Sequence, residues 1–268
     1  MIRVANAPVS YGAFELTVGV LPNVPGPDEV LDAIAAAGYE GTELGPLGYL
    51  GETGELQERL ERRRLALAGA FVEIRFGPRQ ELAELEATLA LLEGTGAKPV
   101  LADAGPRDGQ VDVDGVARAA EVARKHGFEP TFHHHMGTRV QTVAEIERLL
   151  ELTDVGLLLD TGHLLAAGGD PIQGLRDWRD RIDHVHVKDV RLDVLRGAAD
   201  WPEAWRDGVF CELGTGDVDL AAFFADLDEY SGWLVVEQDW VPGPADDPEG
   251  QIEAQARNRR WLANNAGL

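Results

Sequence analysis

The chain has 268 residues, of which 44% are hydrophobic, and a formal net charge of −23 at pH 7. A surface this acidic repels phosphate backbones and anionic lipid headgroups, which argues against nucleic acids and membranes as partners. No apolar run reaches the roughly 18 residues of a membrane span, and the first residues do not form a basic segment followed by an apolar core. We therefore expect a cytoplasmic protein. The single cysteine, Cys211, excludes an intrachain disulfide and a cysteine-based metal site.

Strand and helix patterns alternate from the beginning of the chain. A short apolar run at residues 2–7 predicts the first strand. Pro27, followed by two acidic residues, predicts the start of a helix that ends at Gly38. The same patterns predict further strands at residues 41–45, 65–74 and 99–102, and further helices at residues 55–64, 79–93 and 113–127.

The second half of the chain continues this alternation. At residues 155–160, an apolar run ends in an aspartate, which is typical of a strand buried on both faces. Thr142 and Glu145 have the spacing of a capping box at the start of a helix, and Asp170-Pro171 is a typical helix start. The other predicted elements are strands at residues 128–133, 182–187 and 233–237, a helix at 220–227, and a last helix that runs to about residue 261.

Eight strand–helix units without a linker predict an α/β fold, a single (β/α)8 TIM barrel over residues 1–268. The one long connection, residues 189–216, follows the seventh strand. It contains Trp201, Trp205 and Phe210 and is too apolar for a solvated linker. We expect it to be a lid over a pocket or a contact in an oligomer.

Chemically active side chains gather where the predicted strands end. In such barrels the C-terminal ends of the strands carry the active site. Six of the seven histidines lie there, and only His126 lies elsewhere. The candidates at these ends are Glu43, His133, His134, His135, Asp160, His163, His184, His186, Lys188 and Glu237. Carboxylates and imidazoles without thiolate suit a divalent cation. The set favours Mn²⁺ or Co²⁺, with Zn²⁺ or Mg²⁺ as alternatives.

Strand alternation orders some of these candidates. His184, His186 and Lys188 share one face of the seventh strand, so we expect His184 deepest, His186 at the rim and Lys188 above the pocket. Lys188 is also one of only three lysines in the chain. Four candidates have simpler structural alternatives: packing for His134, a satisfied core position for His184, an ion pair for Glu43 and a helix cap for His163.

Several motifs from the first strand to the last carry a family resemblance. They are Asn6-Ala7-Pro8-Val9-Ser10, Gly41-Thr42-Glu43-Leu44-Gly45-Pro46, His133-His134-His135-Met136-Gly137-Thr138, Leu159-Asp160-Thr161-Gly162-His163, His184-Val185-His186-Val187-Lys188-Asp189-Val190-Arg191 and Val235-Val236-Glu237-Gln238. Together they resemble the inosose dehydratase group of the xylose-isomerase-like barrels, which handle sugars and sugar acids.

The resemblance implies one divalent metal ion held by residues from strands five to eight. In this chain those positions are His133, Asp160, His186 and Glu237. Glu237 also counts among the catalytic candidates. The proton transfers and substrate contacts fall to His135, His163 and Lys188, with Glu43 and Arg191 as further substrate-binding candidates.

The fifth strand departs from the wider superfamily. Its isomerases usually place a glutamate there as metal ligand and proton-transfer base, whereas this chain has three histidines. The inosose dehydratase pattern also has histidines at this point, so the difference favours a lyase over an epimerase. Alignment from the start of the strand favours His133 as the ligand, and alignment back from the following helix favours His135.

We therefore expect a metal-dependent dehydratase of a keto-cyclitol such as scyllo-inosose, with a role in inositol or sugar catabolism. The main alternative is a metal-dependent keto-sugar isomerase or epimerase. An endonuclease of the abasic-site type shares this barrel, but the charge of −23 argues against it. A binding protein that has lost catalysis is the fourth hypothesis. The expected partner is a small sugar or cyclitol, and the chain is compatible with a homo-oligomer.

Overall fold

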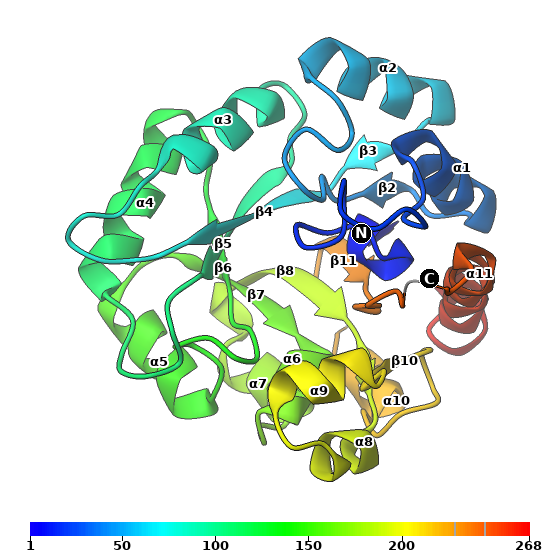
Figure 1. Ribbon diagram of the computed structural model, residues 1–268. Helices are drawn as coiled ribbons and strands as arrows, with labels where there is room; N and C mark the ends of the chain where they lie inside the picture. Colours follow the sequence, from blue (N-terminus) through cyan, green and yellow to red (C-terminus); the bar gives the residue numbers. More distant parts are fainter. Residues whose placement is uncertain (228, 244) are drawn as a thin grey trace.

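The computed structural model describes residues 1–227, 229–243 and 245–268. Its main sheet has nine strands in the order β3-β2-β1-β11-β8-β7-β6-β5-β4, and the pairs are parallel (Figure 1). The strands are β1 (Ile2–Asn6), β2 (Gly41–Thr42), β3 (Ala66–Leu67), β4 (Gly69–Ile74), β5 (Lys98–Asp103), β6 (Thr131–His133), β7 (Gly156–Asp160), β8 (Ile182–Val187) and β11 (Gly232–Val236).

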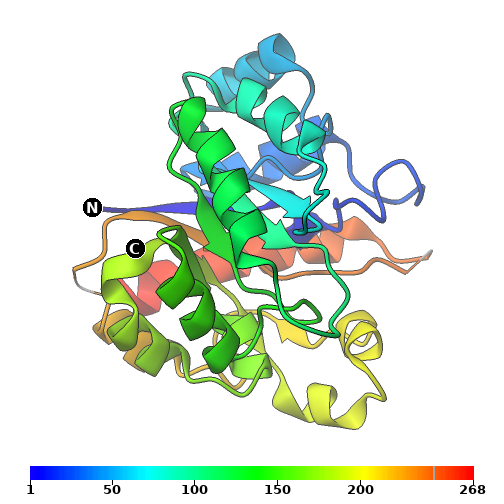
Figure 2. The same cartoon turned by 90° about the vertical axis from the view of Figure 1, so that its left-hand side faces the viewer.

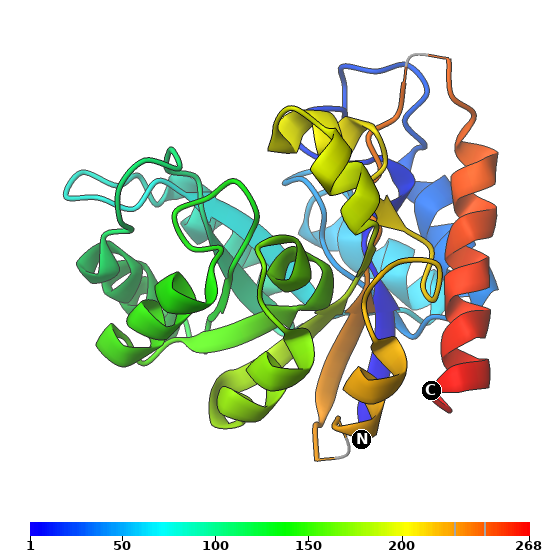
Figure 3. The ribbon, with the colours of Figure 1, turned by 90° about the horizontal axis from the view of Figure 1, so that it is seen from below.

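Helices surround this sheet on the outside (Figures 1 and 2). The longer ones are α1 (Pro27–Ala37), α2 (Thr53–Arg63), α3 (Ala83–Leu92), α4 (Val113–Lys125), α5 (Val143–Leu152) and α11 (Pro248–Asn265). The shorter ones are α6 (Thr161–Ala166), α7 (Pro171–Asp177), α10 (Leu220–Ala225) and the 3-10 turns η1 (Pro8–Tyr11) and η2 (Arg179–Arg181). The last helix, α11, packs beside α1 (Figure 3), so the two ends of the barrel sequence are neighbours in space.

The third predicted strand, residues 65–74, is divided at Ala68 into β3 and β4. The first part pairs with β2 and the second with β5. Ala68 itself donates to the Thr42 carbonyl at 2.8 Å and accepts from the Lys98 amide at 3.2 Å, so one residue is bonded to both neighbours. This single stretch closes the sheet, and the predicted (β/α)8 barrel is confirmed.

Two predicted strands are shorter than expected, each for a local reason. The second ends at Thr42 and not at residue 45, and at Gly45 the backbone turns away with φ 65°. The fifth begins at Thr131 and not at residue 128, after Pro130, which has no N–H to donate to a neighbouring strand. Glu43 therefore lies just beyond its strand, where its side chain reaches the open end of the barrel.

The two faces of β8 separate the apolar core from the polar interior. Val185 and Val187 are fully buried in the core that packs against the helices. His184 and His186 alternate with them and point to the inside of the barrel, where they contact Glu43. Apolar packing on one face thus fixes which side chains line the interior.

Residues 189–216 form an ordered segment. It contains β9 (Asp189–Val190), α8 (Leu192–Gly197), α9 (Trp201–Arg206) and β10 (Phe210–Cys211), and β9 pairs with β10 in antiparallel orientation. The buried Asp189 carboxylate accepts from the amides of Gly214, Gly216 and Val218, which ties the end of the segment to its beginning. Among the described residues, no helix has both the length and the apolar character needed to cross a membrane.

We expect Asp103→Ala to lower the free energy of unfolding by about 3–5 kcal/mol, the usual cost of removing one partner of a buried ion pair. The fully buried Asp103 carboxylate contacts Arg139 Nη2 at 2.6 Å and Nε at 2.9 Å, and it also accepts from the Gly105 amide. Urea unfolding measures the effect, with the exposed Asp108→Ala as control. Equal urea midpoints of unfolding for Asp103→Ala and Asp108→Ala would contradict the stabilising role of the Asp103–Arg139 ion pair.

Candidate active site

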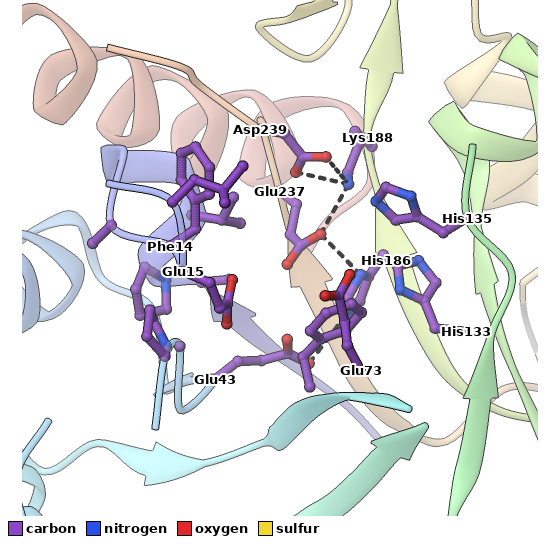
Figure 4. Close-up of a pocket in the computed structure, with 18 of the residues that line it drawn as sticks. Phe14, Glu15, Glu43, Glu73, His133, His135, His186, Lys188, Glu237 and Asp239 are labelled. Carbon is purple, nitrogen blue, oxygen red and sulfur yellow. Dashed lines mark hydrogen bonds and ion pairs between the residues drawn. The ribbon is translucent and has the colours of Figure 1, made fainter. Parts of the chain in front are cut away.

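A cavity of about 240 Å³ opens at the C-terminal ends of the barrel strands (Figure 4). One part of its wall is apolar and includes Phe14, Phe71 and Trp205. The ionisable side chains in its wall are Glu15, Glu43, Glu73, His133, His135, His186, Lys188, Glu237 and Asp239. Most of the candidates from the strand ends therefore meet in one place.

His186 lies at the centre of the polar cluster. The register of β7 and β8 pairs it with Asp160, and its Nδ1 is 3.7 Å from Asp160 Oδ2. On the other side, the same Nδ1 is 2.9 Å from Glu237 Oε2, at the end of β11. His133 adds its Nε2 at 3.5 Å from Asp160 Oδ2. The ends of these four strands, β6, β7, β8 and β11, thus direct two imidazoles and two carboxylates toward one region.

Several polar atoms in this cluster are buried and have no hydrogen-bond partner among the described residues. They are both ring nitrogens of His133, Nδ1 of His186 and Oδ2 of Asp160. Glu237 is close to His186 but its ion pair is not aligned as a hydrogen bond. Buried polar atoms normally have partners. Ligand atoms of His133, Asp160 and His186 lie within 4.8 Å of one another, so these residues fit a divalent cation with nitrogen and oxygen ligands.

Glu43 orients the metal-ligand candidate His186 from behind. Its Oε1 is 3.1 Å from Nε2 of His186 and 3.0 Å from Nε2 of His184. Burial would raise the pKa of Glu43, but the two imidazoles outweigh it and lower that pKa. Likewise, burial would lower the pKa of His186, but Glu237 and Glu43 raise it well above its usual value. A carboxylate on the second ring nitrogen is the usual support of a metal-bound histidine.

Lys188 is buried, at 1% exposure, among acidic groups. Its Nζ lies 2.8 Å from Asp239, 3.0 Å from Glu237 and 3.2 Å from Asp160. Burial would lower the pKa of Lys188, but these three carboxylates raise it above its ordinary value, so the ammonium stays charged. Asp239 was not among the sequence candidates. The available signal was its position two residues after Glu237, on the same face of an extended chain.

The remaining histidines have distinct environments. His134 is fully buried and its Nε2 accepts from the Asp160 amide at 3.1 Å, which is a packing role. His135 lines the cavity, and burial together with His133 lowers the pKa of His135 to about 4. His163 is fully buried behind Lys188, with Nε2 3.2 Å from Nζ, and its ring centre is 3.8 Å from that of His135.

Arg191 is not brought to this cavity. Its side chain is exposed, and Nη2 donates to the Gly208 carbonyl at 2.6 Å. The reason is local: after Lys188 the chain enters β9 and leaves the barrel mouth, and the Arg191 amide bonds to the Val209 carbonyl. We therefore give Arg191 no further role at the site. Glu15 and Glu73, which the sequence did not distinguish from other surface acids, do line the cavity.

Comparison with known proteins identifies the family. Residues 31–264 match the family model described as xylose isomerase-like TIM barrel. The chain belongs to this family. It is 34% identical to an inosose dehydratase of Geobacillus kaustophilus (strain HTA426), covering 91% of this chain and 89% of that protein. It is 32% identical to an inosose dehydratase of Clostridium beijerinckii, covering 90% of each. The resemblance seen in the motifs is confirmed, and the chain is an enzyme with lyase activity.

Solved structures of low sequence identity share the fold of this family member. The IOLI protein, whose crystal structure contains a zinc atom, aligns with a TM-score of 0.73 at 17% identity and covers 99% of this chain and 100% of that one. The probable 3-DHS dehydratase AsbF from Bacillus anthracis aligns with a TM-score of 0.71 at 15% identity and covers 98% of this chain and 99% of that one. These likenesses support the barrel assignment.

Proposed function

We propose that the protein is a divalent-metal-dependent dehydratase that removes water from a keto-cyclitol such as scyllo-inosose. The observation that carries this proposal is the set of buried nitrogen and oxygen atoms without hydrogen-bond partners on His133, Asp160 and His186, next to a charged lysine at the cavity. The two inosose dehydratases that match about nine-tenths of the chain support the substrate class.

The residues that would hold the ion are His133, Asp160, His186 and Glu237. On strand five we favour His133, because it lies beside Asp160 and His186, whereas His135 lies beside His163 and Asp239. The mixed ligand set favours Mn²⁺ or Co²⁺, and Zn²⁺ or Mg²⁺ are alternatives. When bound, such an ion polarises a ketone oxygen and stabilises negative charge that develops on it.

His135 is our candidate for the base. Its Nδ1 is 2.8 Å from the Met136 carbonyl oxygen, so Nδ1 carries a proton and Nε2 has the free lone pair. Because burial holds the pKa of His135 at about 4, the ring is uncharged at neutral pH. Its Nε2 can then take the proton from the carbon beside the ketone. The C–H electron pair then forms a carbon–carbon double bond as the neighbouring hydroxyl leaves, and the proton taken up by His135 balances the hydroxide, so that one water is lost.

Lys188 is our candidate for the group that stabilises the departing hydroxyl. Its ammonium lines the cavity and can donate a hydrogen bond to oxygen. His163 and Asp239 contact Nζ from behind and fix its direction. Glu43 contributes indirectly by holding His186, and it also lines the cavity floor.

We propose that residues 189–216 act as a lid. Trp205 lines the cavity, its ring centre is 5.3 Å from that of Phe14, and its Nε1 donates to the Asp239 carbonyl at 3.0 Å. Trp201 lies close to His163, with ring centres 6.0 Å apart. This segment therefore lies against His163 through Trp201 and contributes Trp205 to the apolar wall of the cavity.

Trp205→Ala is expected to raise KM about tenfold, the effect of losing roughly 1.5 kcal/mol of apolar contact. Steady-state kinetics measure this effect, with Trp233→Phe, outside the cavity, as control. Deleting residues 201–205 should raise KM further or, if the segment is an oligomer contact, change the molecular mass in solution. A deletion variant with unchanged KM and mass would contradict both roles.

Product mass tests the function itself. The protein is freed of metal, reloaded with Mn²⁺, Co²⁺, Zn²⁺ or Mg²⁺, and incubated with scyllo-inosose, other inososes and ketoses. We expect a product lighter than its substrate by one water, formed only by the metal-loaded protein. A product of unchanged mass would instead identify a keto-sugar isomerase or epimerase and would overturn the dehydratase proposal.

A further inference from the structure

Two exposed glutamates line the cavity near the metal-ligand candidates. Glu15 lies in the connection after η1, and Glu73 lies near the end of β4. Figure 4 shows both carboxylates turned toward the interior of the pocket, away from the backbone that carries them. Among the described residues, no cationic side chain and no side-chain donor contacts either carboxylate. Their oxygens are therefore available to a bound molecule.

Each glutamate is accompanied by an aromatic ring in the same wall. Phe71 and Glu73 are two residues apart on β4, so they share the inner face, while Val72 and Ile74 pack into the core. Phe14 directly precedes Glu15 and also lines the cavity. An aromatic surface next to a carboxylate suits a ring that has C–H groups on its face and hydroxyls on its edge.

The charge of the lining is strongly negative. Glu15, Glu43, Glu73, Glu237 and Asp239 contribute carboxylates, whereas Lys188 is the only lysine or arginine among the described lining residues. The charge of that lysine is already balanced by Asp160, Glu237 and Asp239, so it gives the lining no net positive charge. A bound divalent ion would not reverse this excess. Partial burial, and then the carboxylates of Glu15, Glu84 and Asp103, raise the pKa of Glu73, which agrees with several acids lying near one another.

We propose that Glu15 and Glu73 are specificity-determining residues that bind hydroxyls of the substrate outside its reacting carbonyl and repel anions. The enzyme would accordingly select an uncharged polyhydroxylated ring and reject sugar acids and sugar phosphates. The cavity is marked as a ligand site by the unpartnered ring nitrogens of His133, which is 3% exposed. The role assigned to the two glutamates rests on the proposed function, because it places the reacting ketone at the metal-ligand candidates.

The test compares binding of a neutral and an anionic ring to the metal-loaded protein by calorimetry. Myo-inositol is the neutral probe, and quinate, a cyclohexane polyol carboxylate, is the anionic one. The variants are Glu15→Gln, Glu73→Gln, the double variant and Glu73→Ala, with Glu61→Gln on the exposed face of α2 as a charge-matched control. Thermal unfolding by circular dichroism verifies that each variant is folded.

We expect wild type to bind myo-inositol at least tenfold more tightly than quinate. Glu73→Ala should raise the Kd for myo-inositol and the KM for scyllo-inosose about tenfold or more, the scale of a lost hydrogen bond to a charged group, while kcat changes less than about threefold. The double glutamine variant should tighten quinate binding about threefold, because it removes two negative charges that are exposed and therefore partly screened by solvent. Glu61→Gln should match wild type in every measurement.

Three results would overturn the inference: equal affinity of wild type for the two rings, no binding of either ring, or a double variant whose affinities equal those of Glu61→Gln. A fall in kcat without a change in KM in Glu73→Ala would also overturn it, because the residue would then act on the reacting atoms. The proposed function fails separately. If wild type dehydrates no inosose but the variants shift binding as described, the dehydratase assignment is wrong and the specificity role is retained.

Discussion

Asp160→Asn is expected to lose the bound divalent ion and at least about a thousandfold in turnover, since the ion supplies several kcal/mol of transition-state stabilisation. The substitution removes the charge of a ligand candidate but keeps its shape. The Oδ1 atom of Asp160 accepts from the His163 amide at 2.8 Å and caps α6, and asparagine can retain that bond. Metal content by inductively coupled plasma mass spectrometry and turnover on the same preparation measure the effect.

Removing the other ligand candidates should have the same result. His186→Ala and Glu237→Ala should each lose most of the metal while the fold is kept. Glu43→Gln should weaken metal affinity by a smaller factor, roughly 10–100-fold, because Glu43 only holds the second nitrogen of His186. The exposed His126→Ala should bind metal like wild type. Full metal occupancy in Asp160→Asn or Glu237→Ala would refute the assignment of the site.

Lys188→Arg should keep the metal but lose roughly two to four orders of magnitude in turnover, the usual scale for a positioned proton-transfer or hydrogen-bonding group. The Lys188 side chain is fully enclosed by Asp160, Glu237, Asp239 and His163. A planar, larger guanidinium keeps the positive charge there but cannot place its donors where the compact ammonium places them. Steady-state turnover, metal content and urea unfolding are measured together, with the exposed Lys125→Arg as control.

The uncharged Lys188→Met variant separates the structural and chemical roles of this lysine. It leaves Asp239 as a buried carboxylate without its cation, so we expect a loss of about 3–5 kcal/mol in the free energy of unfolding, which Lys188→Arg does not share. Near wild-type turnover in Lys188→Arg would show that the lysine only supplies a positive charge that balances the nearby carboxylates. Loss of metal instead would assign it to supporting the ligands, and the acid would have to be sought at His135 or His163.

Much of the barrel can be predicted from the amino-acid sequence alone. Each strand is a short apolar run between glycines, prolines or helix caps, and each helix has its own apolar stripe. Because parallel strands present their C-terminal ends at one side of the sheet, Asp160, His186 and Glu237 could be predicted to meet without knowledge of any contact. Alternation along β8 similarly predicted that His184, His186 and Lys188 point the same way, as the structure places them.

Other features depend on the paths of the loops that connect the strands and helices, and only the tertiary structure shows those paths. The division at Ala68 arises because one stretch pairs with two neighbours, which local periodicity does not encode. Arg191 follows Lys188 closely in sequence but leaves the cavity with β9. Glu15 and Glu73, by contrast, come from a loop and a strand end with no distinguishing pattern, yet they face the same pocket. Alternation along a strand determines the face of the sheet on which each side chain lies. The paths of the loops and the charges of residues that are distant in sequence determine which side chains come together in one site.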